Sequence, residues 1–84
     1  MRVDVKLFAG LREKLPQHPR GAGPVELAPG ASLAALLDQL GIEDRSATMI
    51  LVNGVQAPRG RARRAALALG EGDTVAIFPP LAGG

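Results

Sequence analysis

Alternating polar and apolar residues open the chain and predict its first strand. In Arg2-Val3-Asp4-Val5-Lys6-Leu7 every second residue is apolar, so one face of an extended segment would meet a core, and Phe8 falls on the polar face. Two short apolar segments, 25–27 and 74–78, predict a second and a last strand. The continuously apolar segment 49–52 predicts a central strand buried on both faces or nearly so, and the Asn-Gly pair after it is typical of a hairpin turn.

Helical spacing occurs in one segment between these strands. Ser32 is a residue type that begins helices, and Gly41 is one that ends them. The apolar residues between them fall on one stripe, which would face a core: Leu33, Leu36, Leu37 and Leu40. Asp38 and Gln39 lie outside that stripe, so we expect both in solvent.

The segment between the first two strands predicts little regular structure. Leu11 and Leu15, four residues apart, favour about one helical turn before Pro16. Residues 17–23, rich in glycine and proline, are typical of a loop. His18 stands alone there, without a second histidine or a carboxylate at ligand spacing. We therefore expect a solvated loop histidine and no metal site.

The order of these elements predicts the fold class. Two strands, a helix, the 49–52 strand, a short returning strand at 55–57 and the last strand suit an α+β roll, the β-grasp, in which a mixed sheet of four to five strands wraps around one main helix. Residues 1–78 would form this domain. Pro79 and Pro80 offer no N–H to a sheet, and Pro80 keeps Pro79 extended, so residues 79–84 would leave the domain as a flexible tail.

The same alternation places both aromatic residues of the chain. If Val75 and Ile77 face the helix, Phe78 faces away from it, as Phe8 does on the first strand. The first and last strands are neighbours in a β-grasp, so Phe8, Phe78 and one side of the 49–52 strand would form an apolar patch beside the tail. Such a patch marks a partner site. The alternative is that loops cover the rings or that they fold over the sheet edge.

The composition of the chain excludes several kinds of chemical site. The 84 residues suit one small domain, and the absence of cysteine excludes a disulfide, a thiolate metal site and a persulfide carried on this chain. The N-terminal residues lack the apolar core of a signal peptide, and no apolar run approaches a membrane span. We therefore expect a cytoplasmic protein with no membrane partner and no bound cofactor.

The positive charge is concentrated in one short segment. Arg59, Arg61, Arg63 and Arg64 lie close together, and outside them six basic residues face eight acidic ones. We expect the segment 58–64 to be a solvated loop, with docking to an acidic partner surface as the alternative. We do not expect nucleic-acid binding, because no aromatic residues interleave the arginines to stack bases.

Four sequence blocks together carry a resemblance to a known family. They are Leu7-Phe8-Ala9 with Leu11-Arg12-Glu13, Leu51-Val52-Asn53-Gly54, the segment Leu69-Gly70-Glu71-Gly72-Asp73-Thr74-Val75-Ala76, and the terminal Phe78-Pro79-Pro80-Leu81-Ala82-Gly83-Gly84. With these the chain resembles the ubiquitin-like sulfur carriers of the MoaD/ThiS type, most closely the small, sulfur-carrying subunit of molybdopterin synthase. The thiamine-biosynthesis carrier shares the Gly-Gly ending but usually lacks the two prolines.

The resemblance implies a function for the terminus. An ATP-using adenylyltransferase related to ubiquitin-activating enzymes would adenylate the carboxylate of Gly84, and a persulfide-derived sulfur would replace AMP to give a thiocarboxylate. The tail residues Pro79, Pro80, Leu81, Ala82 and Gly83 would contact the partners. In the molybdopterin branch, a large synthase subunit would bind the tail in a heterotetramer and supply the catalytic groups, so the chain would not be an enzyme on its own.

Other functions stay open at this point. The acceptor of the sulfur could instead belong to thiamine, cysteine or transfer RNA thiolation, because the fold does not decide the product. A ubiquitin-like modifier would join Gly84 to lysines of other proteins. A plain β-grasp interaction domain would use Gly83 and Gly84 only as a flexible end.

Overall fold

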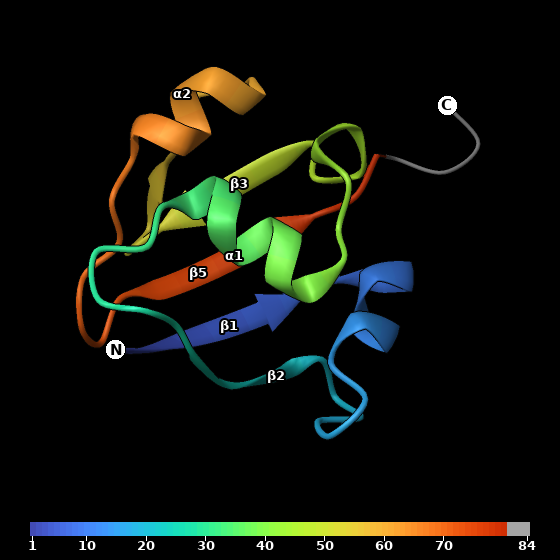
Figure 1. Cartoon of the computed structure of the whole chain (residues 1–84). Coiled ribbons are helices and arrows are strands. Elements are labelled where there is room, and N and C mark those ends of the chain that lie inside the picture. The colour runs from blue at the N-terminus through green and yellow to red at the C-terminus, as the bar shows by residue number, and fades with distance from the viewer. Residues whose placement is uncertain (81–84) are drawn as a thin grey trace.

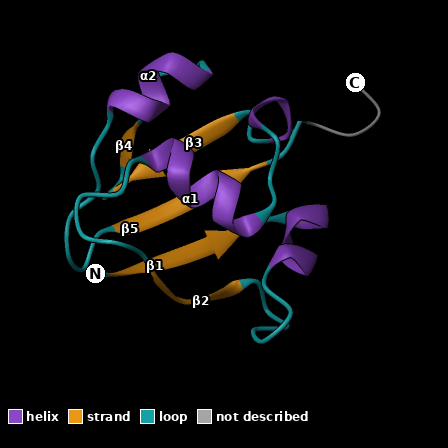
Figure 2. Ribbon diagram, viewed as in Figure 1, coloured by secondary structure: helices purple, strands orange, loops and turns teal. Residues whose placement is uncertain are grey.

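A five-stranded mixed sheet with helices on one face forms the structure (Figures 1 and 2), a computed structural model that describes residues 1–80. The strands are β1 (Arg2–Leu7), β2 (Ala22–Glu26), β3 (Met49–Val52), β4 (Val55–Gln56) and β5 (Thr74–Phe78). Their order is β2-β1-β5-β3-β4. β1 and β5 run parallel at the centre, and the other neighbours pair antiparallel. The predicted β-grasp roll is confirmed.

The main helix, α1 (Leu33–Leu40), covers one face of the sheet (Figure 2). It begins and ends where the sequence predicted. The Oγ of Ser32 accepts a hydrogen bond from the Ala35 N–H at 3.1 Å, and Gly41 ends the helix with φ 72°. Leu33, Leu36 and Leu37 are fully buried, and Leu40 packs at the edge of the core.

The core lies between α1 and alternate residues of the strands. On β1 these are Val3, Val5 and Leu7, and on β5 they are Val75 and Ile77, all of them buried. Leu11 and Leu15 are also buried in the core, and the helical turn predicted before Pro16 is a 3₁₀ helix, η1 (Ala9–Lys14). The second strand begins earlier than predicted, because residues 22–26 pair with β1 along their whole length.

The strand at 49–52 departs from the prediction of burial on both faces. Only Ile50 is buried, and Met49, Leu51 and Val52 are half-buried. The reason is that the helices lie on one side of the sheet, so the apolar side chains of the other face meet solvent. The hairpin turn is confirmed: Asn53 and Gly54 both have positive φ, and the Asn53 Oδ1 accepts from the Thr74 N–H at 2.9 Å.

A second helix occupies part of the segment that was expected to be a loop. It is α2 (Arg61–Ala66), and it packs beside α1. Alanine and arginine are strong helix formers, which explains why these residues form a helix once tertiary contacts hold them. Within residues 1–80 the structure has no helix of the length and apolar character needed to cross a membrane.

Candidate functional site

The two phenylalanines stack on the sheet face that points away from α1. Their ring centroids lie 4.3 Å apart and the ring planes differ by 8°. Because Leu7 and Ile77 are register partners on the buried face, the next residue of each strand projects outward. Phe8 is 37% exposed and Phe78 is half-buried, so no loop within residues 1–80 covers the pair completely. The alternation therefore placed both residues correctly.

A groove of about 480 Å³ lies where the chain leaves the sheet, and we call it the tail-root groove. Its lining residues come from three strand ends and the segment before α2: Phe8, Ala9, Thr48, Met49, Arg59, Phe78, Pro79 and Pro80. Met49 is the register partner of Phe78, which brings the apolar side of β3 to the groove as predicted. Aromatic, methionine and arginine side chains are those enriched in protein interfaces.

The tail begins at the last hydrogen bond of the sheet. The Thr48 N–H donates to the Phe78 carbonyl at 2.8 Å, and the two prolines that follow have no N–H to extend the ladder. The remaining predicted tail residues, Leu81, Ala82, Gly83 and Gly84, lie outside the described residues. Their roles stay predictions.

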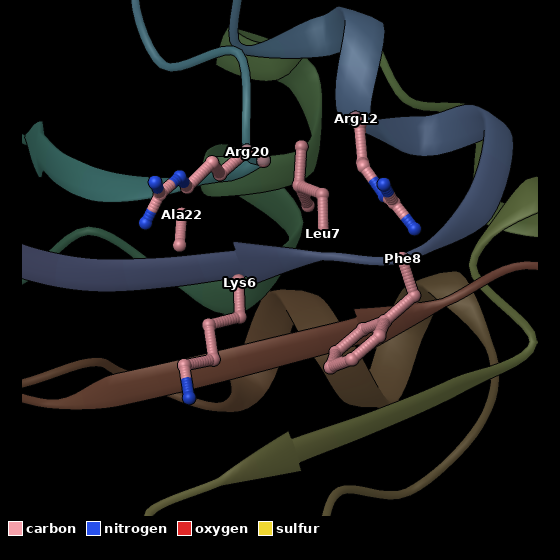
Figure 3. A pocket seen from close by; sticks show the side chains of 7 residues that line it. Lys6, Leu7, Phe8, Arg12, Arg20 and Ala22 are labelled. Carbon is pink, nitrogen blue, oxygen red and sulfur yellow. The ribbon is translucent and has the colours of Figure 1, made fainter.

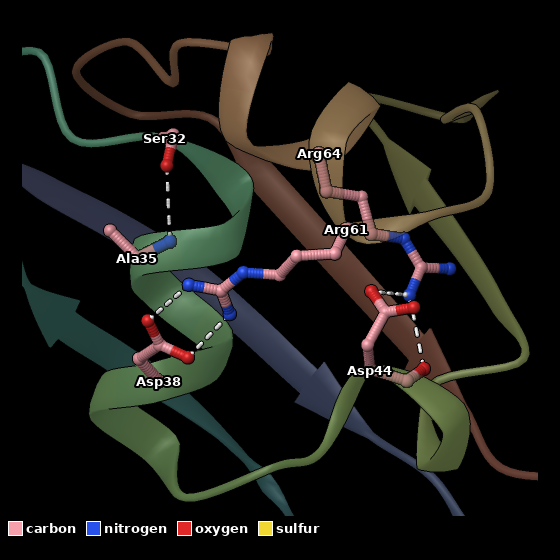
Figure 4. A network of polar contacts seen from close by, with 6 residues as sticks. All are labelled: Ser32, Ala35, Asp38, Asp44, Arg61 and Arg64. Carbon is pink, nitrogen blue, oxygen red and sulfur yellow. Dashed lines mark hydrogen bonds and ion pairs between the residues drawn. The ribbon is translucent and has the colours of Figure 1, made fainter.

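Two of the four clustered arginines hold α2 in place (Figure 4). Arg61 donates two hydrogen bonds to the carboxylate of Asp38, at 2.6 and 2.7 Å. Hydrogen bonding to this guanidinium lowers the pKa of Asp38, and the same bonds raise the pKa of Arg61. Asp38 is exposed as predicted, yet it has a specific partner on α2.

Arg64 is the only buried charged residue of the part of the chain that the structure describes, with 1% of its surface exposed. One guanidinium nitrogen donates to the Asp44 carboxylate at 2.8 Å, and the other donates to the Ala47 carbonyl at 2.8 Å. These bonds join α2 to the short 3₁₀ helix η2 (Asp44–Ser46). The expectation of a solvated loop is wrong here, because half of the basic cluster serves to dock α2.

The other two arginines are exposed. Within residues 1–80 neither Arg59 nor Arg63 forms an ion pair. Arg59 lines the tail-root groove and thus places a positive charge beside its apolar floor. The sequence alone does not distinguish the four arginines. Two of them gain acidic partners and two stay exposed only when α2 packs against the rest of the domain.

A second hollow, of about 360 Å³, shares Phe8 with the tail-root groove, and we call it the basic hollow (its residues are drawn in Figure 3). Its lining residues are Lys6, Leu7, Phe8, Arg12, Arg20, Gly21 and Ala22. The three basic residues come from β1, η1 and the turn before β2, so no sequence motif indicated that they meet. Among the described residues no cluster of histidine and carboxylate side chains suits a metal ion.

Comparison with known proteins gives one family and several similar structures. The ThiS family model matches residues 5–84. SAMP1 from Haloferax volcanii is 26% identical with full coverage of both chains and a TM-score of 0.68. The HVO 2177 protein of the same organism is 28% identical, covering 100% of this chain and 87% of its own, with a TM-score of 0.70.

A third structure is similar in fold. It is described as a putative molybdopterin converting factor, subunit 1, from Pyrococcus furiosus, and it is 23% identical, covering 96% of this chain and 99% of its own, with a TM-score of 0.68. No curated protein sequence matches the chain significantly.

Proposed function

The chain belongs to the ThiS family, and from this premise we propose that it is a sulfur carrier whose Gly84 carboxylate is converted to a thiocarboxylate. The observation that carries the proposal is the family match, which extends to residue 84 and includes the Gly-Gly ending. A side chain at either glycine would hinder attack on the reacting carbonyl, so the sequence suits acyl chemistry at this end.

The proposed chemistry proceeds in three steps. The Gly84 carboxylate attacks the α-phosphate of ATP on an adenylyltransferase of the ubiquitin-activating type, and pyrophosphate leaves. A persulfide of the sulfur-donor system attacks the acyl carbon, and AMP leaves with the bonding electrons. A second thiol then cleaves the remaining S–S bond, which forms a disulfide and leaves the thiocarboxylate on Gly84. The partners supply ATP and the thiols, so this chain acts as a cosubstrate and is not an enzyme on its own.

The tail-root groove supports this function as a docking site. Its exposed and half-buried apolar residues lie where the tail begins, so a partner that covers Phe8, Phe78, Pro79 and Pro80 would receive the tail in a fixed direction. Stacked aromatic rings form a rigid apolar surface that loses little side-chain entropy on binding. The same groove would serve the adenylyltransferase and the sulfur acceptor in turn.

For the acceptor we propose the large subunit of a molybdopterin synthase, with this chain as the small subunit of a cytoplasmic heterotetramer. The Pro-Pro pair before the terminal residues favours that branch over the thiamine carrier. The large subunit would bind the tail and transfer its sulfur to a cyclic pterin precursor. Delivery to thiamine, cysteine or transfer RNA is the alternative within the same chemistry.

A second function, protein modification, is favoured by one comparison. SAMP1 matches this chain over the whole length of both, and a further H. volcanii structure is described as small archaeal modifier protein 1. A modifier shares the adenylation step, but the acyl group then passes to a lysine amine and forms an amide bond. The fate of the acyl group therefore separates the two functions.

Intact mass spectrometry of the protein coexpressed with its adenylyltransferase tests the proposal. We expect a mass increase equal to the replacement of one oxygen by sulfur, and a variant without Gly84 that stays folded but unmodified. Absence of this increase with ATP and a sulfur donor present would contradict the carrier function. Conjugates on denaturing blots would support the modifier, and complementation of strains that lack each pathway's carrier would identify the acceptor.

A further inference from the structure

Three basic side chains surround the basic hollow without an acidic partner. Lys6, Arg12 and Arg20 are all exposed, and within residues 1–80 none of them forms an ion pair. In Figure 3 the guanidinium of Arg12 ends beside Phe8 and that of Arg20 lies near Ala22, whereas the ammonium group of Lys6 extends from β1 across β5, on the other side of β1 in this view. Three unpaired positive charges along one hollow give this part of the surface a positive potential, which attracts anionic groups.

The backbone around Gly21 positions one of these charges. Gly21 has φ 76°, and a Cβ at this residue would lie 2.6 Å from the Arg12 Cγ and 2.7 Å from the Leu7 carbonyl oxygen. The Gly21 carbonyl accepts from the Leu7 N–H at 2.7 Å, which fixes the turn against β1. The missing side chain thus lets the stem of Arg12 lie directly on the backbone, and its guanidinium reaches the hollow.

Small residues keep the rest of the hollow open. Lys6 has Ala22 and Ala76 as its register partners on the two neighbouring strands. Neither methyl group fills the space around the lysine stem, so the ammonium group is reachable from solvent. Two guanidinium groups with their planar sets of donors, together with one ammonium, suit carboxylates, which accept paired hydrogen bonds from arginine.

Phe8 connects this hollow to the tail-root groove, because its ring lines both. A protein seated on the stacked rings of Phe8 and Phe78 would therefore extend over Lys6, Arg12 and Arg20. We propose that the basic hollow receives carboxylate side chains from an acidic segment of the protein that docks on the tail-root groove. The identity of that protein rests on the proposed function, whereas the preference for carboxylates rests on the hollow itself.

Nuclear magnetic resonance titration tests the hollow without any partner. The probe is a capped tetraglutamate peptide added to the isotopically labelled full chain, with a tetraglutamine peptide as the uncharged control. We expect saturable shifts of the amide signals of Leu7, Gly21 and Ala22 with the glutamate peptide alone. Raising NaCl from about 0.05 to about 0.5 M weakens this binding, because the charges are exposed and screened.

Two matched variants locate the effect. Arg12→Gln/Arg20→Gln removes two charges from the hollow, and Arg2→Gln/Arg63→Gln removes two exposed arginines elsewhere. We expect the first to bind the peptide about tenfold more weakly and the second to bind as the unchanged protein does. No saturable shifts, or equal affinity of both variants, would overturn the proposal. If the first variant fails to fold, the unchanged protein tests the proposal. Binding that does not weaken with salt, or equal binding of the glutamine peptide, would then overturn it.

Two further measurements separate the ligand class and the partner. The first is the affinity for inorganic pyrophosphate. If pyrophosphate binds at least tenfold more tightly than the glutamate peptide, the hollow is a phosphate site and the carboxylate assignment is overturned. Binding to the adenylyltransferase is then compared between the two double variants, and we expect about a tenfold loss for the hollow variant only. Peptide binding without thiocarboxylate formation would contradict the proposed function and leave the hollow's assignment intact.

Discussion

The two faces of the sheet use the same strands for different purposes. On the inner face, Val5, Val75 and Ile77 are at most 1% exposed and pack under α1. On the outer face, Phe8 and Phe78 stack in the open, at the start of the tail. Adjacent residues such as Ile77 and Phe78 therefore have opposite roles, because successive side chains of a strand point to opposite faces. If the outer face binds partners as proposed, stability and binding can be changed separately by substitutions one residue apart.

The largest effect is expected on the inner face. Ile77→Ala removes a fully buried side chain from the central strand and leaves a cavity beneath α1. We expect a loss of about 3 kcal/mol in the free energy of unfolding, measured by urea denaturation. The folded fraction of this variant keeps its affinity for the adenylyltransferase, since the outer face is unchanged. A loss of less than about 1 kcal/mol would mean that the site collapses around the cavity.

The next effect concerns binding and lies on the outer face. Phe78→Lys places a charge in the tail-root groove and removes the stacked pair with Phe8. We expect the affinity for the adenylyltransferase to fall by about 2 kcal/mol or more, as for a central interface aromatic, with a smaller change in stability. Val55→Lys is the matched control, because Val55 is 70% exposed on β4 and lines neither the tail-root groove nor the basic hollow. If Phe78→Lys mainly unfolds the protein, Phe78 is a core residue.

A smaller effect on stability is expected in the arginine cluster, where a buried and an exposed arginine of α2 can be compared. Arg64→Met keeps the side-chain stem but removes the hydrogen bonds to Asp44 and Ala47, and it leaves the half-buried Asp44 without its partner. We expect a loss of about 2 kcal/mol in unfolding free energy. Arg63→Met, on the exposed side of α2, is expected to change stability by less than about 0.5 kcal/mol. Equal values in urea denaturation would show that the buried pair contributes nothing net.

The smallest effect depends on pH. The Asp73 carboxylate accepts from the Asn53 side chain at 3.0 Å and from the Gly70 N–H at 2.7 Å, and these bonds lower its pKa. A lowered pKa in the folded state contributes stability above the unfolded pKa, and this contribution disappears as the pH falls through the folded value. We expect the melting temperature to fall as the pH drops below about 4, the ordinary range of a free aspartate, and to fall less in Asp73→Asn. Identical acid sensitivity of the two proteins would contradict this assignment.

Sequence periodicity predicted those parts of the fold that depend on local pattern. The alternation on β1 and β5 gave the two faces, and the leucine stripe between Ser32 and Gly41 gave α1. Periodicity treats arginine as a solvent residue, so it missed α2, where the partner of Arg64 lies 20 positions away in sequence at Asp44. It also missed the basic hollow for the same physical reason, because Lys6, Arg12 and Arg20 line one hollow only after three elements have packed.

The terminal residues were interpreted from a family resemblance and not from physical pattern. Nothing in the spacing of residues 81–84 specifies adenylation or sulfur transfer, since glycine contributes only the absence of a side chain. The family match agrees with that interpretation at the level of the ThiS family. The structure adds the position at which the sheet ends: Phe78 lies between Phe8 and Met49.

The parallel pairing of β1 with β5 has a consequence for biosynthesis. Asp4 is the register partner of Thr74, so the centre of the sheet joins two segments that leave the ribosome nearly a whole chain apart. Contacts between such distant segments form late in folding. A nascent chain that stops before residue 74 lacks β5, so neither the centre of the sheet nor the stacked pair of Phe8 and Phe78 can form. Under the proposed function, translation would thus delay docking of a partner on the tail-root groove until residues 1–78 have been made.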